Sequence, residues 1–554
     1  MPPTPSQPTV AVAGGGLAGL AAACALSDIG FRVTLFEKRP FLGGRASSYE
    51  HPGTGEVVDN CQHVLFRVCT NLIEFYERIG VADQIRWFDQ MTFIEPSSRI
   101  STMKSSFLPA PLHTAPSFFG FSFLSMADKL SIARALVPLT LTEQRDTGQS
   151  FQHWLDRHGQ TEHAVTRFWR PILVSALSEE LDRISISSAA QVVRESMKSP
   201  AARQMGVPTV PLTELYNKAG EYVQARGGVL HFRQPIEGFS AFASRIQLQL
   251  RNLDSQPSVG APLLAAVARS GNPEPVQLLA NETFDYLILA LPFDALDRVL
   301  PAATESAPLR EQLSHFENSP ITGIHLWFDR QISDLDHAVL LDRTVQWMFH
   351  KSRLQPMRMQ AGMTEALSST GTQSNAGTQS NAEAPLRKER EGHDFSFEPA
   401  LSERSESKGA AQTSTTKRAL APEAGSYIEL VVSSSKILID KSRAEIVDLA
   451  LAEVREFFPA AREANLVKAT VIKEVNATYS PRPGIDAYRP GPVTPWPHVF
   501  LAGDWTATGW PATMEGAVRS GYLAAEALVS AAEREKVRFL SSDLPSTGFM
   551  RIFS

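Results

Sequence analysis

TVAVAGGGLAGLAAACALS, residues 9–27, joins a short apolar run to an alanine-rich run through three glycines. The apolar run predicts a buried strand over residues 9–13, and the alanine-rich run predicts a helix over residues 17–27 that ends before Gly30. An apolar segment at residues 32–36 predicts a second strand directly afterwards. Strand, turn, helix and strand then occupy about thirty residues, the length of a right-handed parallel βαβ unit. We therefore expect a parallel sheet at the start of the chain.

The glycines of this unit form the pattern G-x-G-x-x-G at Gly14, Gly16 and Gly19. Gly14 permits a tight turn, Gly16 lets backbone amides approach a diphosphate, and Gly19 lets the helix pack close to the sheet. The positive end of the helix then faces two phosphates. Glu37 ends the second strand, where a carboxylate can accept hydrogen bonds from an adenosine ribose. Together these residues predict a dinucleotide site.

Two further motifs favour a flavin over a nicotinamide cofactor. Gly44 and Arg45 place flexible backbone and a guanidinium within reach of a cofactor bound at Glu37. Near the other end of the chain, Asp504 closes an apolar run, and a helix is predicted to open at residue 514. The N-terminus of that helix can stabilise negative charge on a reduced flavin, because it presents free amides and a positive dipole. The predicted cofactor-binding residues are Gly14, Gly16, Gly19, Glu37, Gly44, Arg45, Gly503, Asp504, Glu515, Gly516 and Ala517.

These motifs resemble the flavin-containing amine oxidase and phytoene desaturase superfamily, and the similarity spans nearly the whole chain. Residues 58–65, 211–216, 346–349 and 508–517 are similar to its squalene-associated branch, the hydroxysqualene dehydroxylases of hopanoid biosynthesis. The resemblance implies that FAD is the cofactor and that hydroxysqualene is converted to squalene, with the allylic hydroxyl replaced by hydride from reduced FAD. Cys61 stands where the family pattern has glycine, and it could perturb a turn beside the flavin.

The predicted fold class is α/β, with a Rossmann-like FAD-binding domain of the two-dinucleotide-binding type and an interleaved α+β substrate domain. A helix over residues 212–226 and strands over 229–232, 286–292 and 499–504 are assigned to the first domain. Helices within 153–178 and over 444–458, with strands over 324–328 and 427–432, are assigned to the second. The predicted bounds are 1–100, 208–300 and 471–533 for the FAD-binding domain, and 101–207, 301–360 and 425–470 for the substrate domain.

Two segments are predicted to lie outside the two domains, and the first of them either carries no chemistry or serves as a regulatory docking loop. Residues 361–424 are rich in Ser, Thr, Gly, Gln, Asn, Glu and Lys and contain the sequence GTQSNA twice in succession. Such a composition cannot bury enough apolar area to offset the entropy of ordering, so a disordered insertion is expected. This insertion is not a feature of the family. Residues 534–554 are predicted to form a flexible tail.

The implied reaction requires an acid, because hydroxide is a poor leaving group at neutral pH. His63 is the first candidate for the catalytic acid, and the alternative for this residue is orienting the Asp59 loop or packing near the flavin. Glu515 is the second candidate, although a carboxylate near a helix N-terminus tends to stay ionised and could stabilise an allylic cation instead. Trp505 and Trp510 are expected to wall the site. The histidine and cysteine spacing predicts no metal site.

Composition narrows the expected partners and location. The formal net charge of −6 gives no reason to expect nucleic acid. Cys24, Cys61 and Cys69 show no paired spacing, which favours a reducing cytoplasm. The longest uncharged segment, residues 105–127, is interrupted by prolines, so no membrane-spanning helix is expected.

An apolar polyisoprenoid substrate would need an apolar tunnel and a route to the membrane. The phenylalanine-rich stretches at residues 107–108 and 118–124 either form a mouth lying in the membrane interface or pack in the core. The expected location is therefore cytoplasmic, with peripheral contact to the inner face of the cytoplasmic membrane. The number of subunits stays open.

Three other functions remain compatible with the same motifs. A carotenoid or phytoene desaturase would use oxidised flavin to remove hydride from a polyene. An amine oxidase would need an aromatic cage and a polar amine pocket. A flavoprotein scaffold at the membrane would keep the cofactor motifs without turnover. The motifs for FAD do not fix the direction of hydride transfer.

Overall fold

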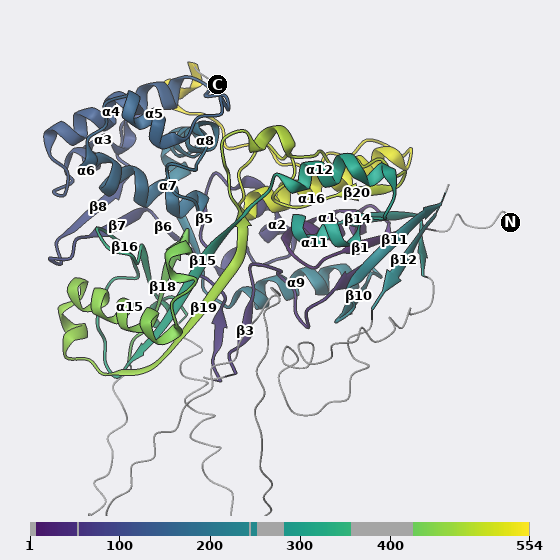
Figure 1. Ribbon diagram of the computed structural model, residues 1–554, viewed down its shortest axis with the longest axis horizontal. Coiled ribbons are helices and arrows are strands. Elements are labelled where there is room, and N and C mark those ends of the chain that lie inside the picture. The colour runs from purple at the N-terminus through teal and green to yellow at the C-terminus, as the bar shows by residue number, and fades with distance from the viewer. Residues whose placement is uncertain (1–6, 53–54, 243–244, 252–281, 356–424, 553–554) are drawn as a thin grey trace, which may run out of the picture.

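The parallel sheet expected at the start of the chain has five strands, in the order β10-β2-β1-β14-β20 (Figure 1). All of its pairings are parallel. The strands are β1 (Thr9–Ala13), β2 (Arg32–Glu37), β10 (Val229–Phe232), β14 (Tyr286–Leu289) and β20 (Val499–Leu501). The computed structural model describes residues 7–52, 55–242, 245–251, 282–355 and 425–552. The beginning, middle and end of the chain therefore contribute to one sheet.

Both faces of the parallel sheet are covered, so its strands are apolar on both sides. On one face, Val10 and Val12 pack in a core with α1 (Leu17–Asp28), α9 (Leu212–Gln224) and α16 (Met514–Ala531). On the other face, Ala11 and Ala13 belong to a separate core. That second core also contains β11 (Ile236–Phe242), β12 (Arg245–Leu250), β13 (Thr283–Phe284), α11 (Phe293–Val299) and α12 (Ala307–Ser314).

A mixed sheet of seven strands, in the order β19-β15-β18-β17-β16-β7-β8, forms the second part of the molecule. Its strands are β7 (Gln90–Ile94), β8 (Ile100–Lys104), β15 (Asn318–Phe328), β16 (His337–Leu340), β17 (Trp347–His350), β18 (Tyr427–Ser433) and β19 (Leu466–Tyr479). One face packs on α3 (Ala115–Phe119), α4 (Met126–Leu141), α5 (Phe151–Arg157), α6 (Glu162–Ala164), α7 (Arg170–Leu177) and α8 (Ile186–Met197). The other face packs on α15 (Arg443–Phe457).

Short elements connect these two parts. They are the pair β3 (Ser48–Glu50) and β4 (Val57–Asp59), the sheet of β5 (Leu65–Phe66), β9 (Met205–Pro208) and β6 (Ile85–Phe88), and the helices α2 (Thr70–Arg78) and α13 (Lys351–Leu354). In Figure 1, α3 to α8 gather at the upper left, α15 lies at the lower left and the parallel sheet lies on the right. The expected α/β fold with an interleaved α+β part is confirmed.

Two predicted domain bounds cut through the seven-stranded sheet. Residues 1–100 were assigned to the FAD-binding domain, but β7 pairs with β8 and β16 of the other sheet. The bound at residue 471 falls inside β19, which stays paired with β15 as far as Tyr479. Both bounds are corrected because a strand belongs to the sheet that satisfies its backbone hydrogen bonds.

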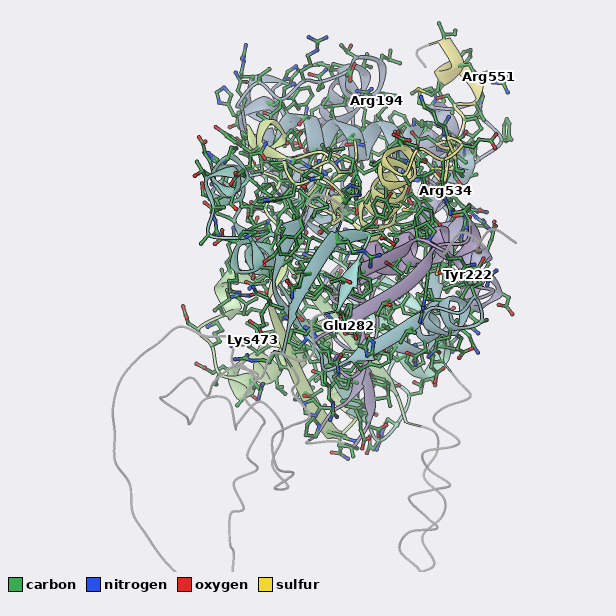
Figure 2. All side chains as sticks on the ribbon, turned by 90° about the vertical axis from the view of Figure 1, so that its right-hand side faces the viewer. Arg194, Tyr222, Glu282, Lys473, Arg534 and Arg551 are labelled. Atoms are coloured by element: carbon green, nitrogen blue, oxygen red, sulfur yellow. The ribbon has the colours of Figure 1, made fainter. Side chains whose placement is uncertain are left out.

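The last residues differ from the expected flexible tail. Phe539 is buried in the core around α1 and α16, and the Ser541 amide donates to Asn71 Oδ1 over 2.9 Å. Further on, the Phe549 amide donates to the Ala110 carbonyl over 2.9 Å. The turn that carries Arg551 lies at the top of the molecule (Figure 2). The predicted insertion at residues 361–424 lies outside the described residues.

Candidate flavin and substrate site

One cavity of about 880 Å³ lies between the two sheets and collects most of the predicted site residues. The predicted residues in its walls are Gly14, Gly16, Glu37, Gly44, Arg45, His63, Gly503, Asp504, Glu515 and Ala517. Gly19 lies behind the wall, where an added Cβ would meet the Gly14 carbonyl, so its place between helix and sheet agrees with the expected packing role. Gly516 donates its amide to Thr513 Oγ1 at the start of α16. Residues from both ends of the chain thus surround one space.

The start of α1 is suited to a diphosphate. Gly16 is the N-cap residue, no side chain caps the helix, and its first turn has no acidic residue. The first amides are therefore free to bind an anion. Gly16 has an ordinary φ of −77°, and a Cβ added there would meet only Gly44, at 3.8 Å. Backbone conformation does not require this glycine, but a group bound in the adjacent space would.

Glu37 is buried beside this turn and keeps room for a ligand. Its Oε2 accepts the Gly15 amide over 2.7 Å, and its Oε1 accepts the Arg39 amide over 2.8 Å. An ionised carboxylate has about four lone-pair positions, so two remain for ribose hydroxyls. The residues at this end of the cavity therefore fit the adenosine and diphosphate of FAD.

The loop that carries Gly44 and Arg45 links the two ends of the chain. The Gly43 amide donates to the Gly15 carbonyl over 2.9 Å, and a Cβ on Gly44 would approach the Gly16 Cα to 2.9 Å. Arg45 Nη2 lies 2.5 Å from Asp504 Oδ1. This ion pair joins the loop that follows β2 to the loop that follows β20, and both of its residues line the cavity.

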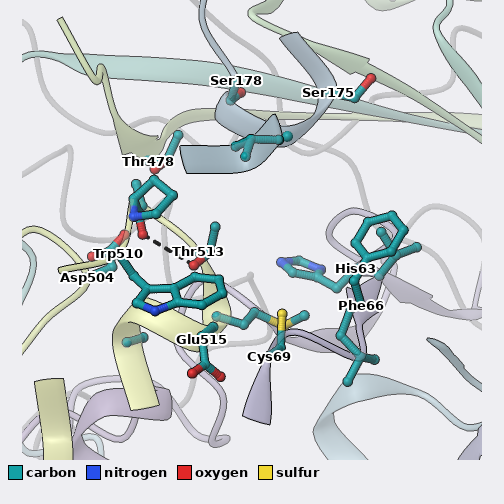
Figure 3. Close-up of a pocket in the computed structure, with 18 of the residues that line it drawn as sticks. His63, Phe66, Cys69, Ser175, Ser178, Thr478, Asp504, Trp510, Thr513 and Glu515 are labelled. Atoms are coloured by element: carbon teal, nitrogen blue, oxygen red, sulfur yellow. Dashed lines mark hydrogen bonds between the residues drawn. The ribbon is translucent and has the colours of Figure 1, made fainter. Parts of the chain in front are cut away.

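Glu515 has a different environment from the one predicted. Its Oε1 accepts Asn71 Nδ2 over 2.8 Å, and its Oε2 accepts the Leu72 amide over 2.8 Å. Burial raises the pKa of Glu515, which these hydrogen bonds and Arg519 partly counter. The carboxylate caps the start of α2 and turns away from His63 (Figure 3). Both oxygens are occupied, which favours a role in tying α16 to α2 over stabilisation of a substrate cation.

His63 faces the cavity, and its ring points toward Trp510 and Thr513 (Figure 3). Its Nδ1 lies 2.7 Å from the Cys61 carbonyl. A carbonyl only accepts, so Nδ1 carries the proton and Nε2 offers a lone pair. Burial lowers the pKa of His63, although the Cys61 carbonyl opposes the shift. The neutral ring can accept a hydrogen bond from a hydroxyl, whereas the cationic ring needed for an acid forms more readily as pH falls.

Cys61 was expected to perturb the turn beside the flavin, but its backbone shows no such perturbation. It does not have a positive φ, so its backbone accepts a side chain without strain. The thiol is buried, and burial raises its pKa. Of the two expected tryptophan walls, Trp510 lines the cavity, while Trp505 Nε1 donates to the Leu291 carbonyl and packs behind it.

A buried charge cluster supports the His63 wall and was not predicted from the sequence. Lys351 Nζ lies 2.6 Å from Asp59 Oδ2, 2.9 Å from Gln62 Oε1 and 3.3 Å from Glu429 Oε2. The side chains of Lys351, Asp59 and Glu429 are 2%, 3% and 0% exposed. Gln62 in turn donates to the His63 carbonyl over 3.0 Å. The cluster therefore anchors the loop that carries His63.

The cluster has two carboxyl groups for one ammonium group, and the two acids share it unequally. Burial opposes ionisation of Asp59, but Lys351 and hydrogen bonds lower its pKa overall. Burial raises the pKa of Glu429 to about 7, against the attraction of Lys351. Burial also opposes the charge of Lys351, but Asp59 and Glu429 outweigh it and raise its pKa. Asp59 and Lys351 are thus the ion pair, and Glu429 is the group that binds a proton near neutral pH.

The remaining walls of the cavity are mostly apolar and come largely from the helices on the seven-stranded sheet. They include Phe66, Phe118, Phe119, Leu136, Val137, Leu141, Phe168, Ile172, Val192, Trp347 and Phe349. Among the described residues, no group of three or more His, Cys, Asp or Glu side chains is arranged to hold a metal ion. None of the helices formed by the described residues combines the length and the apolar composition that a membrane-spanning helix needs.

Comparison with known proteins identifies the family. Residues 17–383 and 389–529 match the family described as flavin containing amine oxidoreductase. The chain belongs to this family. It is therefore an oxidoreductase, and FAD is its cofactor.

Individual relatives share both sequence and fold over almost the full length. The chain is 25% identical over 549 residues to 15-cis-phytoene desaturase of Synechococcus elongatus, covering 97% of this chain and 98% of that protein. It is 23% identical to zeta-carotene desaturase of Synechocystis sp., covering 96% and 99%. An oxidoreductase from Methanosarcina mazei has a TM-score of 0.61 at 15% identity, covering 95% of this chain and 100% of that one. Cyclohexylamine oxidase from Brevibacterium oxydans has a TM-score of 0.56 at 14% identity, covering 95% and 100%.

The variant Gly16→Val tests the diphosphate site. Valine can adopt the φ of −77°, but its side chain would enter the space beside Gly44. We expect an unchanged circular dichroism spectrum and at least about fivefold weaker FAD binding, since overpacking of this size costs about 1–3 kcal/mol. The control Gly491→Val places the same side chain where no atom lies within 4 Å. A Gly16→Val protein with normal FAD content would contradict this assignment.

The variant Glu429→Gln tests the charge cluster through the pH dependence of stability. Below pH 4.5 the group is protonated in both folded and unfolded chains, and between there and about pH 7 only the folded chain keeps the proton. The free energy of unfolding should therefore fall as pH rises through this window, by on the order of 3 kcal/mol. Urea unfolding at pH 5 and pH 8 should show a smaller fall for Glu429→Gln than for the exposed control Glu311→Gln. Equal slopes would show that Glu429 does not hold this proton.

Proposed function

We propose that this oxidoreductase acts on a long apolar polyisoprenoid and converts hydroxysqualene to squalene. The observation that carries the proposal is that one cavity contains both the predicted dinucleotide site, at Gly16 and Glu37, and a region with apolar walls that include Phe118 and Phe168. We call this second region the apolar arm. A charged or strongly polar substrate would find few partners in that arm, whereas an isoprenoid chain would bury its surface there. The sequence segments that resemble the squalene-associated branch support the finer assignment, and three of them, 58–65, 346–349 and 508–517, contribute to the cavity walls.

In the proposed reaction, one set of residues binds the cofactor and His63 transfers the proton. The first amides of α1 and the Glu37 carboxylate would hold the diphosphate and ribose of FAD, and the start of α16 would lie at its ring. Bound FAD supplies hydride transfer. Nε2 of His63 would contact the substrate hydroxyl, and its protonated form would donate to the departing oxygen. The apolar walls exclude water and so protect an allylic cation from capture.

A desaturase is the second candidate, and the full-length similarity to phytoene and zeta-carotene desaturases favours it. Those relatives are named for removing hydrogen from hydrocarbons, which contain no leaving oxygen and require no acid. The amine oxidase and scaffold alternatives are outcomes of the same test.

Product analysis decides between these functions. FAD-loaded protein, reduced anaerobically with dithionite, should convert hydroxysqualene to squalene with about one product per reduced flavin, because one hydride is transferred per turnover. Mass spectrometry measures the product. New conjugated double bonds from oxidised enzyme and phytoene would support the desaturase instead. Peroxide formed with an amine would support an oxidase, and no turnover in any assay would support the scaffold.

The same assay tests His63. We expect His63→Ala to retain FAD and to lose at least about 100-fold in squalene formation, the usual contribution of a general acid. In the unchanged enzyme the rate should rise as pH falls from 8 to 6, because the lowered pKa of His63 leaves little imidazolium at neutral pH. That pH dependence should disappear in His63→Ala and persist in the exposed control His153→Ala. Equal rates in all three proteins would exclude the acid role.

We further propose that the mouth of the cavity contacts a lipid bilayer. The phenylalanine-rich stretches divide between the two expected roles: Phe118 is buried, whereas Phe107 is 96% and Phe119 is 46% exposed. Leu112, 49% exposed, and Val137, 57% exposed, line the cavity together with Phe119, and Phe107 precedes Leu112 by five positions in the chain. Exposed apolar side chains at the rim of an apolar cavity would lie in the membrane interface and let the substrate enter without crossing water.

Vesicle flotation tests the bilayer contact. Phe107→Ser combined with Phe119→Ser should reduce the fraction bound to phospholipid vesicles several-fold, because each change removes buried apolar area at the interface. The control Ile437→Ser removes a side chain that is 68% exposed on another surface. Equal flotation of both variants and the unchanged protein would contradict the proposal.

A further inference from the structure

Arg203 is a positively charged residue in the wall of the cavity. It ends the short turn Pro200–Arg203 and lines the cavity. Among the described residues, no carboxylate forms an ion pair with it, and its one hydrogen-bond partner is the thioether sulfur of Met103. Burial lowers the pKa of Arg203 to about 10, so the guanidinium stays charged at neutral pH.

Among the described residues, the Met103 sulfur is the hydrogen-bond acceptor that Arg203 contacts, and no carboxylate balances its charge. His113, which the charge of Arg203 reaches, is fully buried, and neither ring nitrogen has a hydrogen-bond partner in the described part of the chain. Burial and then Arg203 lower the pKa of His113 to about 4, so the ring is neutral. By contrast, Arg45 on the same cavity is paired with Asp504. A guanidinium that remains unpaired in apolar surroundings is unfavourable unless a ligand provides oxygen acceptors.

Arg203 lines the same cavity as Leu112 at the proposed mouth and Trp510 beside the start of α16. Its neighbour Ala202 packs with Val68 and Trp510, the tryptophan that precedes α16. The charge of Arg203 also reaches His113, whose chain neighbour Leu112 is partly exposed at the proposed mouth. A long substrate that enters at the mouth and reaches the flavin would therefore pass Arg203.

We propose that Arg203 binds the oxygen atom of the substrate and makes the cavity selective for a hydroxylated polyisoprenoid over the corresponding hydrocarbon. This inference rests on the proposed function and specifies what that site recognises. A guanidinium has five N–H donors and no acceptor, so it can bind a hydroxyl oxygen. A hydrocarbon of the same length fills the apolar arm but leaves the cation unpaired, and the cavity then discriminates against it.

Ligand binding, measured without turnover, tests the proposal. Oxidised FAD-loaded protein is titrated with hydroxysqualene and with squalene, and the change in flavin absorbance reports binding. We expect hydroxysqualene to bind about 10- to 100-fold more tightly than squalene, the range for a hydrogen bond to a charged group. Arg203→Met, an uncharged side chain of similar length, should remove that preference and leave squalene binding unchanged. Arg203→Lys should keep part of the preference, because the lysine ammonium keeps the positive charge but lacks the planar fork of N–H donors of the guanidinium.

The controls separate this inference from the proposed function. Arg157→Met removes an exposed arginine from α5 and should keep the full preference. If hydroxysqualene binds through Arg203 but is not converted, the recognition stands and the reaction assignment fails. If the unchanged protein shows no preference, or if Arg203→Met keeps it, the inference is overturned. Displacement of hydroxysqualene by inorganic phosphate in the unchanged protein but not in Arg203→Met would overturn it too, in favour of a phosphate-bearing ligand such as a lipid headgroup. Should Arg203→Met fail to retain FAD, Arg203→Lys decides, and an undiminished preference there contradicts recognition by the guanidinium fork.

Discussion

The close approach of α1 and α16 is the constraint on which the site depends. α1 consists largely of alanine, glycine and leucine and is buried along almost its entire length. A Cβ added to Gly521 of α16 would collide with the Ala18 carbonyl, so only glycine permits this spacing. Because the two helices begin at opposite ends of the chain and pack this tightly, their N-termini reach the same cavity. The Arg45–Asp504 ion pair then fixes the loops between them.

The polar groups around the cavity fall into two kinds that differ in whether the protein itself satisfies them. Glu515 forms hydrogen bonds with α2, and Lys351 pairs with Asp59. These contacts satisfy the charged groups and hold α2 and the His63 loop in place. In the described part of the chain, no protein oxygen or nitrogen atom pairs with Nε2 of His63 or with the guanidinium of Arg203. Half-buried polar groups that open onto a cavity and that the fold leaves unsatisfied are where a ligand gains most by binding, because pairing them removes an existing penalty.

Local patterns were sufficient for the parts of the fold that depend on a few consecutive residues. The strand at residues 9–13, the helix that follows it and the strand at residues 229–232 agree with the structure, since burial and turn signals lie within each segment. The cluster of Lys351 with Asp59 was not predicted because its members are 292 positions apart. The one local signal was Glu429, a charged residue inside the otherwise apolar strand β18. Glu515 was assigned from its own helix, whereas its hydrogen-bond partners lie 444 positions away on α2.

The same distinction bears on the choice between a dehydroxylase and a desaturase. Both reactions need FAD at the junction of α1 and α16 and an apolar arm for the isoprenoid, so the fold and the cofactor residues do not separate them. Removal of a hydroxyl also needs a proton donor and gains from a hydrogen-bond donor that holds the oxygen, whereas removal of hydrogen from a hydrocarbon needs neither. A cavity specialised for hydrocarbons would gain stability by replacing Arg203 with an apolar side chain, because nothing would pair with its charge. The presence of that cation in the wall of a cavity that His63 also faces therefore favours a substrate that carries oxygen.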